Sequence, residues 1–321
     1  MQALAQARRR RRARGLAGGV LLALALGAAF ACHRRGSPEE CIRQFSSMNP
    51  DVRTRAGNEL ITYDPDEAVP LLIAAAGHEL VRVRFEVMRM LGRFGDPRGI
   101  PTLIAALGDE SPRPAAMAAA SLAQLRAVEA LPALLRYVRD PSPEVRRYVI
   151  AALGPCHSYA VHPEASDSAH AHVLRALDDP TPDIRVAALQ SVREFGYRGA
   201  APLLLRLAGD PSPQVRYVAV QALGELGAAG VKKTRGSATR DPVVGVDAAT
   251  RAAIVEALRE RLEPDELQSV RTASVRSLGE MRAAAAAARL RELAATGTED
   301  DRREARRALA LIAEQQGDAA R

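Results

Sequence analysis

The residues best suited to metal chemistry are gathered in one short stretch of the chain. Four of the six histidines lie between His157 and His172, next to one of the three cysteines. Thiolate and imidazole groups are common ligands of zinc and copper in proteins. The candidate ligands in this stretch are Cys156, His157, His162, Asp167, His170 and His172.

The spacing of these residues also allows a plainer interpretation. It matches no zinc-finger pattern, and His170 and His172 are two residues apart, so they do not share a helix face. A polar insertion whose histidines are solvated or cap the next helix would give the same sequence. A metal site formed by Cys156, His157, His162 and His170 is therefore a hypothesis, and we expect no other cofactor.

A second candidate is a column of arginines that recurs four residues before the acidic residue of successive turns. Spaced guanidinium groups can bind the carboxylates or phosphates of a partner, although a solvated helix face carries arginines too. The column contains Arg136, Arg175, Arg206 and, with a slip of one residue, Arg261. These four are the predicted partner-binding residues.

The elements that must position these residues recur with a period of 31 residues. The repeat is anchored on an arginine that is replaced once by alanine. The anchor positions are Arg53, Arg84, Ala115, Arg146, Arg185, Arg216, Arg271 and Arg302. Two steps are longer, 39 residues before Arg185 and 55 before Arg271. A fixed period of this kind indicates one structural unit that is copied and stacked.

Each repeat contains the pattern of two helices. Apolar or small residues at −1, +3 and +7 from the anchor share one face of a helix, which we call helix A. Glycine follows the +7 residue in several repeats and predicts the end of helix A. Proline predicts the start of the next helix, helix B. The glycines are Gly92, Gly154, Gly224 and Gly279, and the prolines are Pro70, Pro101, Pro132 and Pro202.

A single helix pair cannot bury its apolar face, whereas stacked pairs can. The sequence therefore predicts an all-α, right-handed α-solenoid of about eight repeats over residues 46–321, with insertions near 155–167 and 228–248. Pro112, Pro114 and Ala115 interrupt the pattern in the third repeat and predict a kink there. The last repeat is strongly charged, as expected of a repeat that caps the stack.

The repeat resembles the HEAT-repeat family, in particular the short HEAT-like repeats of phycobilisome lyases. The resemblance is carried by Asp210, Val215, Arg216, Ala219, Leu223 and Gly224 and by their counterparts in other repeats. It implies that the aspartate and the arginine six residues later form a hydrogen-bonded ladder, and that helix B lines a concave binding face. The implied ladder pairs are Asp140 with Arg146, Asp179 with Arg185, Asp210 with Arg216, and Asp265 with Arg271.

The first 31 residues have the three parts of a secretory signal. Six arginines precede an apolar run, which ends in Ala29-Phe30-Ala31 before Cys32. This arrangement resembles a bacterial lipobox and predicts lipidation of Cys32, with residues 32–45 as a tether to the periplasmic side of the envelope, outer membrane more than inner. Simple cleavage after Ala31 and an uncleaved anchor are the alternatives.

The signal also carries most of the positive charge. The chain has 45 basic and 38 acidic residues, and the six arginines of residues 1–31 leave 39 against 38, or about +1. Aromatic residues make up 3% of the chain and tryptophan is missing. Neither charge nor stacking residues therefore favour nucleic acid as a partner.

The most consistent function is a membrane-tethered scaffold in the bacterial cell envelope that binds another protein on the concave face. The sequence contains no G-x-S-x-G, P-loop or H-E-x-x-H motif, so we expect no enzyme. Deoxyhypusine hydroxylase uses this repeat type with several His-Glu pairs, whereas this chain has one, His78-Glu79. A metal-binding module in the fourth repeat and a lyase-like enzyme are the alternatives.

Overall fold

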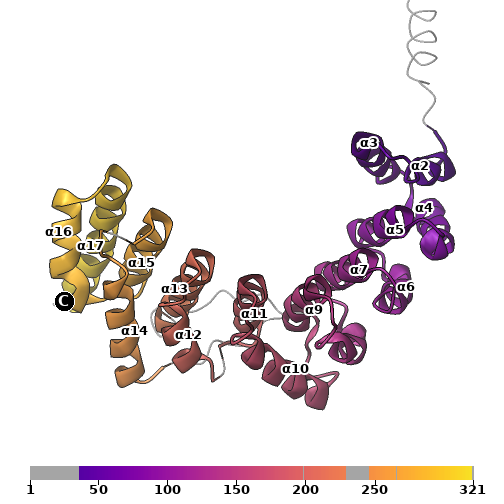
Figure 1. Cartoon of the computed structure of the whole chain (residues 1–321). Coiled ribbons are helices and arrows are strands. Elements are labelled where there is room, and N and C mark those ends of the chain that lie inside the picture. Colours follow the sequence, from indigo (N-terminus) through magenta and orange to yellow (C-terminus); the bar gives the residue numbers. More distant parts are fainter. Residues whose placement is uncertain (1–35, 198, 229–245, 265, 320–321) are drawn as a thin grey trace, which may run out of the picture. The chain divides into compact units, whose positions relative to one another are not determined.

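The computed structural model describes residues 36–197, 199–228, 246–264 and 266–319. The described residues form helices and connecting turns, without a β-strand among them (Figure 1). The predicted all-α solenoid is therefore confirmed. The chain divides into two units, Met1–Tyr63 and Asp64–Arg321, which we describe separately.

The first unit contains two helices that pack against each other, α2 (Pro38–Gln44) and α3 (Pro50–Leu60). The side-chain oxygens of Ser37 and Asn49 accept hydrogen bonds from the first free N–H groups, which explains where the helices begin. Cys41 and Phe45 are fully buried. Part of the predicted tether, residues 38–44, is thus helical and packs on α3, while the tethering role of residues 32–45 stays a prediction.

The described residues of the second unit form seven helix pairs in two rows. The B row contains α4 (Pro65–Ala74), α6 (Ile100–Ala106), α8 (Leu131–Leu134), α10 (Pro163–Ala176), α12 (Ala201–Leu207), α14 (Ala248–Glu260) and α16 (Ala287–Thr296). The A row contains α5 (Val81–Phe94), α7 (Pro112–Leu125), α9 (Pro143–Cys156), α11 (Pro182–Glu194), α13 (Pro213–Ala228), α15 (Gln268–Glu280) and α17 (Glu299–Ala319). Successive A-row helices pack closely, whereas successive B-row helices touch at few places. The A row therefore holds the stack together.

The A row is held by the apolar columns that the sequence showed. Val145, Val149 and Leu153 are buried on α9, and the equivalent residues are buried on its neighbours. Proline is the first residue of α7, α9, α11 and α13, where its missing N–H costs no hydrogen bond. Because each A-row helix has one apolar face, it must pack against the next A-row helix to bury that face.

The glycines that follow the +7 position do not end the helices, contrary to prediction. α9 continues two residues past Gly154, and α13 continues to Ala228, four residues past Gly224. These glycines instead face a small residue of the next A-row helix. A Cβ on Gly224 would lie 2.3 Å from Oγ of Ser277, and one on Gly154 would lie 2.9 Å from Cα of Ser191. They are needed for close approach of the helices.

A serine on the following helix completes three of these contacts, and Ala308 lies opposite Gly279 in the fourth. The Oγ of Ser121, Ser191 and Ser277 donates to a main-chain carbonyl of the preceding A-row helix, those of Met88, Ile150 and Val220 respectively, at 2.7–3.1 Å. Because all three serines are buried, these bonds satisfy hydroxyl groups that water cannot reach. Glycine and serine together set the spacing of the A row.

Two predictions about proline also need correction. Pro101, Pro132 and Pro202 are the second residues of α6, α8 and α12, but Pro70 lies inside α4, which begins at Pro65. The expected kink in the third repeat is not found in its A-row helix. α7 runs without interruption from Pro112 to Leu125, because both prolines fall in its first turn.

The insertion near 155–167 is mostly helical. Its first two residues, Pro155 and Cys156, are the end of α9, which is as long as α5 and α7. A turn follows, and the rest of the insertion supplies the start of α10. Of the insertion near 228–248, residues 229–245 lie outside the described residues. None of the helices in the described part of the chain is long and apolar enough to cross a membrane.

Candidate binding surface

Four anchor arginines of the second unit form ion pairs from one repeat to the next. Nε of Arg84 donates to Oδ2 of Asp109 at 2.7 Å, and Nη2 of Arg84 donates to Oδ1 of Asp109 at 2.9 Å. Arg185 and Asp210 repeat this two-bonded geometry at 2.9 and 2.7 Å. Arg216 pairs with Glu266 through the same two nitrogens, at 3.1 Å for Nε and 2.7 Å for Nη2. In Arg271 both nitrogens contact one oxygen of Asp301, Oδ2, at 3.0 and 2.9 Å. The parallel bonds are the geometry in which guanidinium and carboxylate groups interact most strongly.

The same arginines also bind the turn that precedes their own helix. Nη1 of Arg146, Arg185 and Arg216 donates to the main-chain carbonyls of Asp140, Asp179 and Asp210 at 2.8–2.9 Å. The carboxylates of these aspartates accept N–H bonds within their own turns, from Ser142, Thr181 and Ser212. In each predicted pair that the structure describes, the arginine therefore contacts the main-chain carbonyl of the aspartate and not its carboxylate. The ion pairs instead join an arginine to a carboxylate of the next repeat. Asp265 lies outside the described residues.

Three acids of the ladder, Asp109, Glu266 and Asp301, have a lowered pKa, which favours their charged form. Burial alone would raise the pKa of Asp109, but hydrogen bonds from Arg84 and from the N–H of Ser111 outweigh it and lower the pKa. The pKa of Glu266 and that of Asp301 are lowered in the same way, against burial, by Arg216 and Arg271. These ion pairs thus contribute to the stability of the stack at neutral pH.

Three of the four acids that accept these ion pairs were missed from the sequence. Asp109, Glu266 and Asp301 were not among the predicted ladder residues. The separation of 25 residues in Arg84–Asp109 and Arg185–Asp210 is the signal that could have identified the pairs. The Arg216–Glu266 pair, 50 residues apart, spans the longer repeat.

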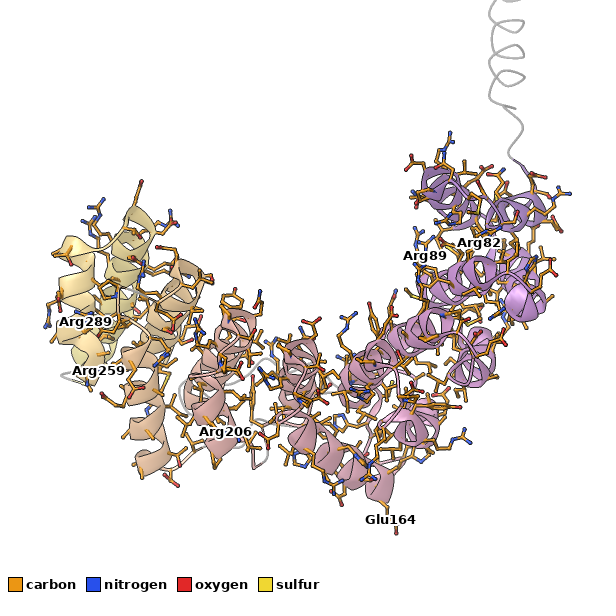
Figure 2. The ribbon with its side chains drawn as sticks, viewed as in Figure 1. Arg82, Arg89, Glu164, Arg206, Arg259 and Arg289 are labelled. Carbon is orange, nitrogen blue, oxygen red and sulfur yellow. The ribbon has the colours of Figure 1, made fainter. Side chains whose placement is uncertain are left out.

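The predicted partner-binding arginines all come from the B row, but they differ in environment. Arg136 is exposed in a short 3-10 turn (Leu135–Tyr137) after α8, and Arg175 is exposed on α10. Arg206, on α12 (Figure 2), forms an ion pair with Asp178. Arg261 pairs with Glu266 at 3.4 Å and so belongs partly to the ladder. The structure therefore does not bring the four together into one uniform stripe.

The proposed metal ligands do not converge. Cys156 is buried and its Sγ donates to the carbonyl of Leu122 at 3.4 Å, and burial raises its pKa to about 12. The rings of His157 and His170 pack on Phe195, with centroids 4.2 and 5.0 Å away. His162 precedes the first turn of α10. Within the described residues no group of three or more His, Cys, Asp or Glu side chains is placed to hold a metal ion.

The cysteines of the described region are both unpaired and buried. They are Cys41 and Cys156, one in each unit. Burial raises the pKa of Cys41 to about 11, so this thiol is a structural, unreactive group at neutral pH. Cys32, the predicted lipidation residue, and the signal before it lie outside the described residues.

Comparison with known proteins places this arrangement among repeat proteins. A family model described as HEAT repeats matches residues 39–120, 100–167 and 171–244, more than half of the chain. A search of curated protein sequences found no match.

Two solved structures with TM-scores above 0.5 give the same result for the fold. The X-ray structure of the Escherichia coli protein YibA is 18% identical with a TM-score of 0.55, over 82% of this chain and 88% of that one. An engineered protein is 16% identical with a TM-score of 0.54, over 87% of this chain and 79% of that one. The CpcE–CpcF complex of phycocyanin lyase from Nostoc is 20% identical over 87% of this chain and 94% of that one, with a TM-score of 0.47. At these identities the likeness concerns the fold alone.

Proposed function

Because the chain belongs to the HEAT-repeat family, we propose that it is a protein-binding scaffold, tethered by lipid to the periplasmic side of the bacterial envelope. The observation that carries the proposal is the repetition itself. Successive helix pairs of the second unit present equivalent side chains at regular intervals, and such stacks bind partners over extended surfaces. Tethering is supported by the sequence before Cys32.

The ion-pair ladder determines which arginines remain available to bind a partner. Arg84, Arg185, Arg216 and Arg271 are occupied by internal ion pairs and have little exposure, so they serve stability. Arg136 and Arg175 are exposed on the B row and have no ion-pair partner in the described part of the chain. These B-row arginines are available to a partner that binds by charge, and the proposed function has no catalytic step.

The scaffold proposal is tested by crosslinking in cells. A photoreactive residue is placed at Arg136 or Arg206, and at the exposed Arg303 of α17 as a control on the A row. We expect the B-row positions to crosslink to one defined protein, which mass spectrometry identifies. Absence of any protein crosslink from either row would refute the scaffold role.

The tether is tested separately. Mass spectrometry of the mature N-terminal peptide should show an acylated Cys32, and Cys32→Ala should move the protein from the membrane to the soluble fraction. A mature chain that begins at an unmodified Cys32 would establish simple cleavage after Ala31 instead.

A further inference from the structure

The ladder of ion pairs is interrupted at one arginine. Of the anchor arginines in the second unit that have a following repeat, Arg84, Arg185, Arg216 and Arg271 each bind a carboxylate of that repeat. Nη1 of Arg146 holds the turn carbonyls of Asp140 and Pro141, as in the other repeats. Its Nε and Nη2, however, have no hydrogen-bond acceptor among the described residues, although these are the atoms that bind the carboxylate elsewhere.

The interruption coincides with the eight-residue insertion. The acid in register with Arg146 is Asp179, which is 33 residues away, whereas the two-bonded pairs Arg84–Asp109 and Arg185–Asp210 are 25 residues apart. Asp179 accepts the N–H of Thr181 at 2.8 Å and forms no ion pair in the described region. The insertion, which lengthens α10, therefore leaves an open position in the ladder.

A cavity occupies this open position. It has a volume of about 150 Å³ and is lined by Arg139, Arg146, His172, Arg175 and Asp179, with apolar walls from α9 and α11. A cavity of about this size admits a group as large as benzene, so an acidic side chain fits. Three arginines and one aspartate are among the residues that line it, which gives the cavity an excess of positive charge.

The surrounding charges are not balanced by other parts of the fold. Arg139, Arg146 and Arg175 take part in no ion pair within the described residues, in a protein whose other arginines are commonly paired. Burial lowers the pKa of His172, and the positive charges of Arg175 and Arg139 lower it further. His172 is thus a neutral group inside a positive field, and it can report the arrival of a negative charge.

We propose that this cavity binds a carboxylate from an acidic segment of the partner protein, which takes the position of the missing acid in the ladder. The two carboxylate oxygens accept from Nε and Nη2 of Arg146, in the same way that Asp210 accepts from Arg185. Arg139 and Arg175 bind further carboxylates of the same segment. The inference rests on the proposed scaffold function and names the chemistry of its partner.

The test uses the full chain in detergent and a fluorescein-labelled hexaglutamate peptide, with hexaglutamine as the uncharged control peptide. We expect hexaglutamate alone to bind, with an affinity that falls as salt rises. Arg146→Gln combined with Arg175→Gln should weaken binding by about tenfold or more. The matched control combines Arg55→Gln and Arg306→Gln, which removes the same charge from exposed helix positions and should leave the affinity unchanged.

Two further measurements keep the inference testable if substitution of Arg146 disturbs the fold. Arg139→Gln with Arg175→Gln changes exposed side chains only, so its effect on binding does not depend on the ladder contacts of Arg146. In NMR titrations, hexaglutamate should raise the pKa of His172, since a bound anion stabilises the imidazolium form. Equal binding by the site variants and the control, or an unchanged His172, would overturn the inference, as would binding of inorganic phosphate without binding of hexaglutamate.

Failure of this inference and failure of the scaffold function have different signatures. If the cavity is not the site, the B-row crosslinks to a partner persist in the Arg146→Gln and Arg175→Gln variant. If the protein is not a scaffold, those crosslinks are missing from the unsubstituted chain as well.

Discussion

Arg185 and Asp210 are joined by two parallel hydrogen bonds, Nε to Oδ2 at 2.9 Å and Nη2 to Oδ1 at 2.7 Å, across the boundary between two repeats. The same arginine holds the carbonyls of Asp179 and Pro180 in the turn before its own helix. One side chain therefore fixes its own turn and the position of the next. This dual role explains why an arginine recurs at the anchor position of a protein that also needs its helices to stack closely.

Removal of this arginine should destabilise the stack. Arg185→Ala leaves the carboxylate of Asp210, whose side chain is 6% exposed, without its cation. Breaking a buried ion pair by removing one partner costs about 3 kcal/mol or more. The free energy of unfolding, measured in urea by circular dichroism, should fall by that order. Arg306→Ala, at an exposed position of α17, is the control, and an equal loss in both variants would argue against the role of the ladder.

Close approach of the A-row helices should be sensitive to a single methyl group. In Gly224→Ala the new Cβ would lie 2.3 Å from Oγ and 2.5 Å from Cβ of Ser277, so α13 and α15 must move apart. We expect a loss of about 2 kcal/mol, the usual cost of overpacking, measured as a lower melting temperature.

Substitutions of Ser277, which faces Gly224, test whether this close contact causes the loss of stability. Ser277→Ala keeps the offending Cβ and should not rescue Gly224→Ala, whereas Ser277→Gly should rescue part of the loss. Gly77→Ala is the control, because a Cβ there meets no atom within 4 Å. A neutral Gly224→Ala would show that the helices are not held at this distance.

The stack should lose stability in acid. The pKa values of Asp109, Glu266 and Asp301 are lowered in the folded state, since the hydrogen bonds from their arginines outweigh burial. The unfolded chain therefore binds protons more readily than the folded one. The stabilisation is present above the ordinary carboxyl pKa values of about 4 and is lost as the pH falls through the lower, folded-state values.

This pH dependence can be assigned with one substitution. Melting temperatures measured between neutral and acidic pH should fall below about pH 4. Asp109→Asn should melt lower than the unsubstituted chain at neutral pH and lose less on acidification. If the two proteins lose equal stability in acid, the Arg84–Asp109 pair does not contribute to the transition.

The buried thiols should resist modification. Burial raises the pKa of Cys156 to about 12 and that of Cys41 to about 11, so the reactive thiolate is scarce at mildly alkaline pH. Iodoacetamide should label both cysteines slowly in the folded protein and quickly in denaturant, with peptide mass spectrometry separating the two sites. Rapid labelling of Cys156 in the folded protein would mean that α9 opens locally at its C-terminal end.

The fold was predictable from the sequence because it rests on local periodicity. Columns such as Val145, Val149 and Leu153 recur at helical spacing, and the polar turns recur at the period of the repeat. A helix pair with one apolar stripe has no stable state except a stack, so the all-α solenoid follows from the chain alone.

The contacts between repeats depended on the tertiary structure. The sequence predicted pairs within one turn, such as Asp210 with Arg216, but the carboxylate of Asp210 binds Arg185 of the preceding repeat, because stacking brings that guanidinium nearer. The glycines looked like helix ends and are instead positions of close approach, since only the neighbouring helix reveals what a Cβ would meet. Likewise, only the tertiary structure shows that Nε and Nη2 of Arg146 have no acceptor among the described residues and that a cavity lies beside this side chain. The sequence shows the insertion, but it does not show which acid the stacking brings within reach of the guanidinium.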